Sequence, residues 1–235
     1  MRRTLYDLAG SDEAIRFSPF CWRTKMALRH KGLDFETVPW RFTDKDLIAR
    51  TGQGRVPVLV DGERWLNDSW PIALHLDEAY PDHPALMRTE AERAAAHFVN
   101  HWCDQVLHPT LRPLLWMEVY KASADKDLGY FRESREKIVG QTLEAFTADR
   151  NGALETFWRT MQPMESALAG HDWLGGDGPN YADYVLFGSL QWANVVSPDP
   201  VLPSDSAAAR WFDRMLDLHD GYGRNAPTCR DASAA

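Results

Sequence analysis

A serine and a cysteine lie three residues apart at the start of a predicted helix, in the run Ser18-Pro19-Phe20-Cys21. Ser18 has the side chain of a helix N-cap, and Pro19 suits the first helical position, where a missing N–H costs nothing. A hydroxyl at a helix N-terminus can also hold a thiolate, because it donates a hydrogen bond to sulfur where the helix dipole favours negative charge. Both effects lower the pKa of a thiol from about 8.5 toward neutrality. The run therefore predicts a helix cap that could also activate a bound thiol.

Thiol–disulfide exchange is a second interpretation of the same run, because Ser18-Pro19-Phe20-Cys21 is a Cys-x-x-Cys motif with its first cysteine replaced. Reactivity in that motif belongs mainly to the first, exposed cysteine at the helix start. Cys21 lies a turn further into the helix, and we expect it to be buried, which argues against this interpretation.

Two more stretches carry groups that could bind a ligand. Asp68 and Ser69 precede a predicted helix, so Asp68 could receive an ammonium while Ser69 and free N–H groups receive a carboxylate. An α-amino acid group carries both of these charges, although a plain helix cap explains the same residues. In Val56-Pro57, the proline cannot donate to a strand ladder, so it should begin its strand, with a cis peptide bond as one arrangement.

The elements that position these residues fall into two parts. The first part reads as strand, helix, strand, short helix, hairpin and helix, over residues 4–8, 19–28, 34–40, 43–51, 55–67 and 68–80. The Asp61-Gly62 pair marks the hairpin turn, and the order indicates a parallel strand pair with a crossover. Pro81 and Pro84 then mark a linker.

The second part reads as helices only, over residues 90–107, 111–122, 127–148, 153–169, 180–196 and 207–218. We expect His108-Pro109 to bend or break the first pair of helices. Asn180 and Asp183 form a variant of the capping box. The polar chain from Arg224 is expected to fray. The predicted divisions are a first domain at 1–80, a linker at 81–88, a helical domain at 89–225 and a tail at 226–235.

Composition narrows the classes of function. The first 80 residues hold 12 basic and 12 acidic residues, so the later part carries the whole net charge of −8, and nucleic acid is an unsuitable partner. No run of about 18 apolar residues predicts a membrane span, and no apolar stretch near Met1 predicts a signal peptide. Three widely spaced cysteines favour a reducing compartment, so we expect a cytoplasmic protein.

His97 and His101 share one helix face, so this pair could bind a metal ion. Such pairs on long helices are usually surface or interface residues, and no glutamate-bearing motif accompanies them. We therefore predict no metal.

The order of elements, together with Ser18-Pro19-Phe20-Cys21, Val56-Pro57 and Asp68-Ser69, resembles the cytosolic glutathione S-transferases over nearly the whole chain. The resemblance implies an α/β thioredoxin-like N-terminal domain that binds glutathione and an all-α C-terminal domain that supplies the electrophile pocket. It also implies a homodimer.

Carried over residue by residue, the resemblance gives Ser18 the role of stabilising the glutathione thiolate. It implies that the backbone of Val56 pairs with the cysteinyl unit, that Pro57 is the cis-proline, and that Asp68 and Ser69 hold the γ-glutamyl group. Arg55 fills the basic position before Val-Pro, and Arg41 or Lys45 is the candidate for the glycyl carboxylate. The candidates for the aromatic substrate pocket are Phe17, Phe20, Trp40, Trp116 and Tyr120.

Within the family, the chain is most similar to bacterial β-aryl etherases and related fungal transferases. The similar stretches are Trp22-Arg23-Thr24-Lys25, Asp68-Ser69-Trp70, Trp173-Leu174-Gly175-Gly176-Asp177, Trp211-Phe212-Asp213-Arg214 and Asp220-Gly221-Tyr222-Gly223-Arg224. This likeness implies attack of the thiolate on a carbon beside a ketone, with a phenolate leaving. A non-catalytic glutathione-binding module and a thiol–disulfide oxidoreductase are the alternatives.

Overall fold

The first part of the chain folds around a four-stranded mixed sheet. A computed structural model describes residues 3–233 and contains β1 (Arg3–Leu8), β2 (Glu36–Trp40), β3 (Val58–Asp61) and β4 (Arg64–Asn67). The strand order is β2-β1-β3-β4, with β1 parallel to β2 and antiparallel to β3. The predicted crossover and hairpin are therefore confirmed. Gly62 has a φ of +62° at the hairpin turn, a conformation that glycine adopts without strain.

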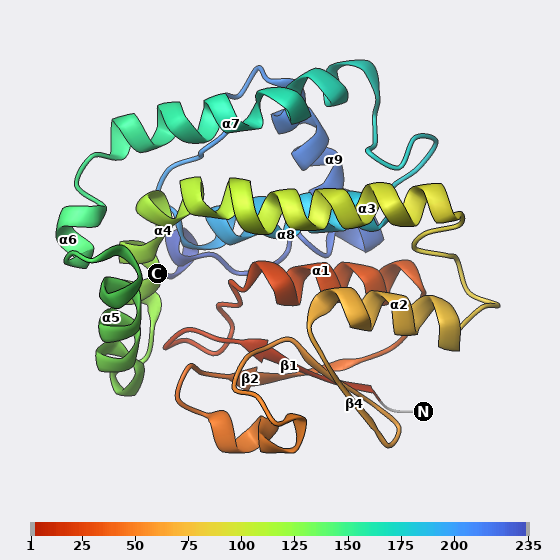
Figure 1. The fold of residues 1–235 in the computed structure, drawn as a ribbon, viewed down its shortest axis with the longest axis horizontal. Coiled ribbons are helices and arrows are strands. Elements are labelled where there is room, and N and C mark those ends of the chain that lie inside the picture. The colour runs from red at the N-terminus through yellow and green to blue at the C-terminus, as the bar shows by residue number, and fades with distance from the viewer. Residues whose placement is uncertain (1–2, 234–235) are drawn as a thin grey trace.

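Two helices cover one face of this sheet, α1 (Pro19–His30) and α2 (Ser69–Ala79), while the short η1 (Lys45–Thr51) connects β2 to β3 (Figure 1). Lys31, just past the end of α1, donates from Nζ to the Tyr80 carbonyl just past the end of α2, at 3.0 Å. The two C-terminal ends therefore lie together. The N-termini of α1 and α2, which carry Ser18 and Asp68, consequently share the opposite end of the layer.

All the elements that the structure describes after residue 89 are helices. A long rod of α3 (Glu90–Trp102), η2 (Cys103–Leu107) and α4 (His108–Ala122) crosses above α1 and α2, and α7 (Arg150–Gly170) lies outermost (Figure 1). Helix α8 (Tyr181–Val196) runs through the centre with nearly every residue buried, and α9 (Ala207–Gly221) follows it. The predicted fold class, a thioredoxin-like domain followed by an all-helical domain, is confirmed.

Of the bend or break predicted at His108-Pro109, the break is wrong. The backbone stays helical through η2, a π-type turn in which the His108 N–H donates to the Cys103 carbonyl, five residues back. Pro109 lies in the first turn of α4, and the wide turn before it absorbs the disturbance that a proline causes in a regular helix.

The single helix expected over 127–148 is also wrong. It is divided into α5 (Asp125–Val139) and the short α6 (Leu143–Phe146). Gly140 ends α5 with a φ of +70°, the left-handed conformation of a helix C-terminal cap.

The fraying expected from Arg224 is wrong for the described part of the tail. The Arg224 side chain bonds Asp213 and Asp217, and α10 (Cys229–Ser233) forms near the C-terminus. Arg230 donates to the Ser197 carbonyl at 2.6 Å and to Asn194 Oδ1 at 3.0 Å. Hydrogen bonds to α8 and its C-terminal end therefore hold the tail.

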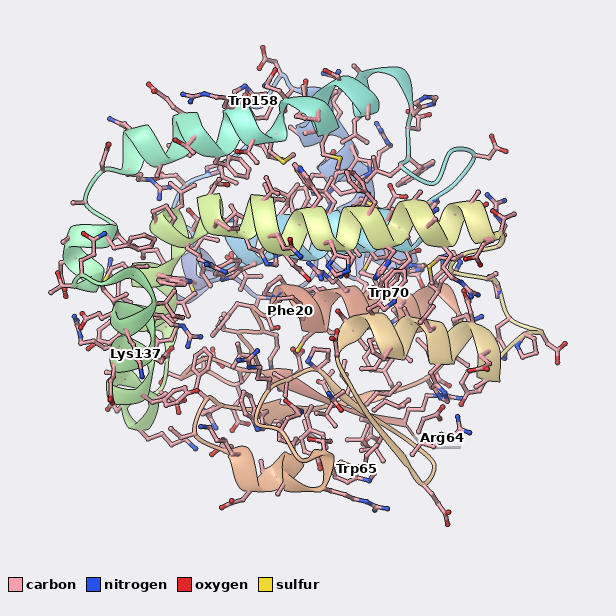
Figure 2. The ribbon with its side chains drawn as sticks, viewed as in Figure 1. Phe20, Arg64, Trp65, Trp70, Lys137 and Trp158 are labelled. Atoms are coloured by element: carbon pink, nitrogen blue, oxygen red, sulfur yellow. The ribbon has the colours of Figure 1, made fainter. Side chains whose placement is uncertain are left out.

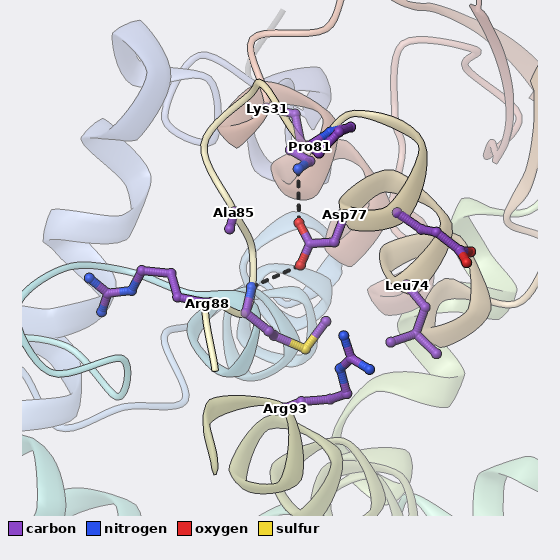
Figure 3. Close-up of a pocket in the computed structure, with 9 residues that line it drawn as sticks. Lys31, Leu74, Asp77, Pro81, Ala85, Arg88 and Arg93 are labelled. Atoms are coloured by element: carbon purple, nitrogen blue, oxygen red, sulfur yellow. Dashed lines mark hydrogen bonds and ion pairs between the residues drawn. The ribbon is translucent and has the colours of Figure 1, made fainter. Parts of the chain in front are cut away.

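Asp77 of α2 fixes the predicted linker. Its carboxylate pairs with Lys31 Nζ at 2.9 Å and accepts from the Met87 N–H at 3.0 Å (Figure 3). It also accepts from the Leu86 N–H at 2.8 Å. The domain boundaries themselves stay a prediction, but the chain at 86–87 is bonded to the first domain. We therefore expect the two parts to move as one body.

Basic side chains of α1 are buried against both parts. Lys25 pairs with Asp7 of β1 at 2.9 Å and lies 3.4 Å from the centre of the Trp22 ring. Arg23 donates to Asn100 Oδ1 at 3.0 Å and pairs with Asp104 at 2.7 Å. The Trp22-Arg23-Thr24-Lys25 stretch thus links the sheet to the helical rod.

The backbones of α1 and α8 approach each other closely at Gly188 of α8. A Cβ at this position would lie 2.3 Å from the Pro19 carbonyl oxygen and 3.3 Å from the Arg23 amide nitrogen. We expect Gly188→Ala to push the two helices apart and to destabilise the fold by about 2 kcal/mol or more, measured by urea unfolding.

Gly129→Ala on α5 is the matched control, because a Cβ at this position would have no neighbouring atom within 4 Å. This second substitution should stabilise the fold by about 0.5–1 kcal/mol, since alanine has less conformational freedom to lose than glycine. Equal effects at the two positions would show that α1 and α8 are not tightly packed at Gly188.

Candidate active site

Ser18 lies in the wall of a cleft of about 480 Å³ between the two parts of the chain. Its Oγ accepts a hydrogen bond from the Cys21 N–H at 3.2 Å, so Ser18 is the N-cap of α1 as predicted. Only 3% of the residue is exposed. The hydroxyl is therefore a nearly dry group at the positive end of a helix, the environment in which a donor stabilises an anion best.

The peptide bond between Val56 and Pro57 is cis, one of the arrangements considered above. Val56 lines the same cleft as Ser18, and Pro57 leads directly into β3.

Asp68 and Ser69 begin α2. Asp68 has a φ of +71°, an uncommon conformation for a residue other than glycine, and its carboxylate accepts from the Trp70 N–H at 3.1 Å. Ser69 is 1% exposed, and its Oγ has no hydrogen-bond partner among the residues that the structure describes. The Ser69 carbonyl accepts from the Tyr181 hydroxyl at 2.7 Å, which ties this helix start to α8. A buried hydroxyl without a partner beside a strained acidic residue is typical of a ligand site.

The three predicted basic residues lie in different places. Arg55 is exposed and lines the cleft, with its backbone held by the Gln53 side chain. Lys45 lies beside the cleft, with Nζ 4.5 Å from the centre of the Tyr130 ring. Arg41 does not line the cleft, because its guanidinium bonds the Gly10 and Ser11 carbonyls and pairs with Glu13.

Aromatic rings form much of the cleft wall. Of the five predicted pocket residues, four line the cleft: Phe17, Phe20, Trp40 and Trp116. Tyr120 is not among the lining residues, because its ring packs behind the wall, on Phe131 and against the guanidinium of Arg132. Figure 2 shows Phe20 at the level of α1, below the rod of α3, η2 and α4. Further residues that the sequence reasoning missed line the cleft: Phe42, His108, Arg112, Val119, Tyr130, Phe131, Ser134, Arg135, Ile138 and Trp192.

Helical spacing could have revealed some of the residues that were not predicted. His108, Arg112, Trp116 and Val119 follow one another at intervals of four, four and three residues, so they share one face of α4. Trp116 was predicted, and the other three follow from the same face.

His108 is a neutral group in this wall. Burial, then the charges of Arg23 and Arg112, hold the pKa of its imidazole well below the usual 6.5. Its Nε2 lies 2.9 Å from Ser189 Oγ, which itself donates to the Val185 carbonyl, so Nε2 is the donor to the serine. The Nδ1 atom is then left as an acceptor.

Cys21 is fully buried, as predicted, and its Sγ lies 3.9 Å from the Tyr6 carbonyl oxygen. Burial, and after it the charge of Asp7, raises the pKa of the thiol well above 9.0. We expect iodoacetamide to leave Cys21 unmodified in the folded protein and to modify it in urea, as peptide mass spectrometry would show. Rapid alkylation in the folded protein would restore thiol–disulfide chemistry as an interpretation.

His97 and His101 lie with their Nε2 atoms 3.0 Å apart, and the His97 ring stacks on Trp70 with centres 4.5 Å apart. Within residues 3–233, no group of three or more histidine, cysteine or acidic side chains is placed to hold a metal ion. Over the same residues, no helix combines the length and the apolar character needed to cross a bilayer.

Comparison with known proteins agrees with this geometry. Residues 14–84 match the family profile described as "Glutathione S-transferase, N-terminal domain", and residues 94–217 match "Glutathione S-transferase, C-terminal domain". Glutathione S-transferase Z1 of Arabidopsis thaliana is 31% identical over 169 residues, which are 70% of this chain and 68% of that protein. The probable glutathione S-transferase GSTU6 of Oryza sativa subsp. japonica is 29% identical over 231 residues, 88% of this chain and 86% of that protein.

Solved structures share the fold. A glutathione S-transferase of Ceriporiopsis subvermispora, crystallised in complex with glutathione, has a TM-score of 0.81 at 23% identity, covering 94% of this chain and 97% of that one. Glutathione transferase GSTFuA3 of Phanerochaete chrysosporium has a TM-score of 0.74 at 24% identity, covering 94% and 92%. Because both domain profiles match in sequence and the two-domain fold matches in space, the chain belongs to the glutathione S-transferase family.

Proposed function

We propose that this protein is a glutathione transferase that binds glutathione against α1 and α2 and transfers it to an aromatic electrophile in the cleft. The observation that carries this proposal is the position of Ser18, a buried hydroxyl at the N-terminus of α1 that opens onto a cleft walled by aromatic rings. The complex of the similar Ceriporiopsis subvermispora protein with glutathione supports the choice of thiol.

The remaining site residues fit the parts of glutathione. Val56 offers its backbone at the cleft for the cysteinyl unit, before the cis bond to Pro57. Asp68 and the unpartnered hydroxyl of Ser69 are suited to the ammonium and carboxylate of the γ-glutamyl group. Arg55 at the cleft, rather than Arg41, is the better candidate for the glycyl carboxylate, and Lys45 is the alternative.

In the proposed reaction, the Ser18 hydroxyl donates to the glutathione sulfur and stabilises its thiolate. The thiolate attacks an electrophilic carbon, a C–S bond forms, and the leaving group departs with the electron pair of its former bond. In the β-aryl ether version, that carbon lies beside a ketone and the leaving group is a phenolate. The thiol proton passes to solvent before the attack.

The test is a pH titration of the ultraviolet absorbance of the glutathione thiolate in the presence of the protein. We expect the thiol pKa of bound glutathione to fall by one or more units, about 1.4 kcal/mol each, and the complex to convert an α-aryloxy ketone or a chloronitrobenzene. Binding without a lowered thiol pKa would favour a non-catalytic module instead. Absence of binding would remove the residue assignments.

A homodimer in the cytoplasm completes the proposal. Phe98 on α3 is 68% exposed, and it is the residue that we expect a second copy to cover. Light scattering should then give about twice the chain mass of 26.8 kDa. The odd number of cysteines agrees with a reducing compartment.

A further inference from the structure

Three arginines line the cleft, Arg55 from the first domain and Arg112 and Arg135 from the helical domain. No aspartate or glutamate is among the lining residues within the described part of the chain. The cleft therefore combines aromatic walls with a net positive charge, although the chain as a whole carries −8.

Neither Arg112 nor Arg135 forms an ion pair with any carboxylate of residues 3–233, in contrast to Arg23 and Arg132. Arg23 pairs with Asp104, and Arg132 pairs with both Glu136 and Glu144. The guanidinium of Arg112 instead lies 5.6 Å from the centre of the Trp116 ring. Burial lowers the pKa of Arg112, as expected for a cation that has lost water without gaining a counter-ion.

Arg135 rests on the aromatic wall. Its guanidinium lies 4.6 Å from the centre of the Phe131 ring and 5.3 Å from that of Phe42, and it donates to Ser134 Oγ at 2.9 Å. Burial, and then repulsion from Arg55 and Arg112, lowers its pKa. Arg55 and Arg112 are thus both close enough to Arg135 to repel its charge.

Like charges held together without a counter-ion cost free energy, and an anion in the cleft removes that cost. Guanidinium groups bind planar carboxylates with two parallel hydrogen bonds, and rings on the same wall bind flat apolar surfaces. A ligand that satisfies both features has an aromatic ring and a carboxylate.

We infer that the electrophile of this transferase is an aromatic compound that carries a carboxylate, which Arg112 and Arg135 bind while the ring packs against Phe20 and Trp116. This inference rests on the proposed function, because it names the second substrate of the same cleft. Arg55 remains for glutathione.

The first experiment measures binding without any reaction. Calorimetry would compare para-nitrobenzoate with para-nitrobenzamide on the protein saturated with S-methylglutathione, which has no thiol to react. We expect the carboxylate to bind roughly ten-fold or more tightly than the amide, as charge-assisted hydrogen bonds predict. In Arg112→Gln and Arg135→Gln this ratio should collapse toward one. Arg93→Gln, an exposed arginine of α3 outside the cleft, is the matched control and should keep the wild-type ratio.

The second experiment measures turnover. Glutathione would react with para-chloro-meta-nitrobenzoate and with the corresponding amide, so that a C–S bond replaces a C–Cl bond and chloride leaves with the electron pair. Each kcat/KM is divided by the rate constant without protein, which removes the intrinsic difference between the two compounds. This normalised kcat/KM should be larger for the benzoate than for the amide. The ratio of benzoate to amide should fall roughly ten-fold in Arg112→Gln.

The outcomes separate the two proposals. A lowered thiol pKa of bound glutathione together with equal affinities for the benzoate and the benzamide would overturn the arginine site and leave the transferase proposal standing. Weaker binding of glutathione in Arg112→Gln, with the benzoate preference unchanged, would overturn it too, because Arg112 would then hold the glycyl carboxylate. A benzoate preference that depends on Arg112 supports the arginine site even where the thiol pKa is not lowered, and in that case only the transferase proposal fails.

Discussion

Replacement of Ser18 by alanine should lower kcat/KM for glutathione transfer by about a hundred-fold, the usual cost of removing one donor from a developing or bound anion in a dry site. The same change should raise the thiol pKa of bound glutathione by one or more units. Steady-state kinetics and the thiolate absorbance titration measure the two effects. The hydroxyl acts on the sulfur of the ligand, so kcat/KM should fall in proportion to the lost thiolate stabilisation.

Ser18 has two roles, because it caps α1 and its hydroxyl donates to the thiolate. The loss of the cap must therefore be separated from the loss of the hydroxyl. Ser18→Gly keeps most of the N-cap stability while it removes the hydroxyl, so its activity should fall as far as that of Ser18→Ala. Ser206→Ala removes a comparable buried N-cap from α9, whose Oγ accepts from the Ala209 N–H at 3.0 Å. That variant should lose about 1 kcal/mol of stability and no activity. Wild-type activity in Ser18→Gly would remove Ser18 from the mechanism.

Asp183→Ala should have the largest effect on stability. The Asp183 carboxylate is fully buried and accepts four hydrogen bonds, from the backbone N–H groups of Leu174, Gly175 and Asn180 and from Trp211 Nε1. Alanine leaves these four donors buried without an acceptor, at about 1–3 kcal/mol each. We expect a loss of about 4 kcal/mol or more, a large fraction of the 5–15 kcal/mol typical of a folded protein. Urea unfolding gives the value.

Two further variants identify the cause of that loss. Asp183→Asn keeps one acceptor oxygen but places an amide NH₂ group against N–H donors. Its free energy of unfolding should therefore lie between those of the wild type and of Asp183→Ala. Asp149→Ala removes an exposed acidic cap from α7, where the carboxylate accepts from one backbone N–H, and should cost about 1 kcal/mol. A similar cost for Asp183→Ala would mean that the four donors find water instead.

Local patterns predicted the features of this fold that local chemistry determines. Ser18 and Asn180 cap helices because their side chains reach free N–H groups nearby in the chain, and the Asp61-Gly62 pair turns the hairpin. The fold class followed from the order of such elements. The family resemblance added the cis bond of Pro57 and the roles proposed for Asp68 and Ser69.

Contacts distant in sequence account for what was missed. Nothing near Arg41 in the sequence indicates a partner for its charge. In the structure, Glu13 and the carbonyls of Gly10 and Ser11 bind its guanidinium outside the cleft. Tyr120 lies one residue after Val119, which lines the cleft, and one residue in a helix changes direction by about 100°. Arg135 lines the cleft on α5, whose Asp127 accepts hydrogen bonds from the Thr43 N–H and hydroxyl of the first domain, and no local pattern in the chain predicts that contact.

The wide turn at Cys103–Leu107 has a consequence for how substrate preference changes among relatives. A π-type turn holds one more residue than an α-helical turn, so it rotates everything after it by about 100° about the helix axis. His108, Arg112 and Trp116 come directly after it and form one wall of the cleft. Deletion of one residue here would turn that face away from the cleft and present a different set of side chains to the electrophile. Insertion or loss of a single codon could thus exchange a whole binding surface at once, and residues aligned across this turn need not be equivalent in space.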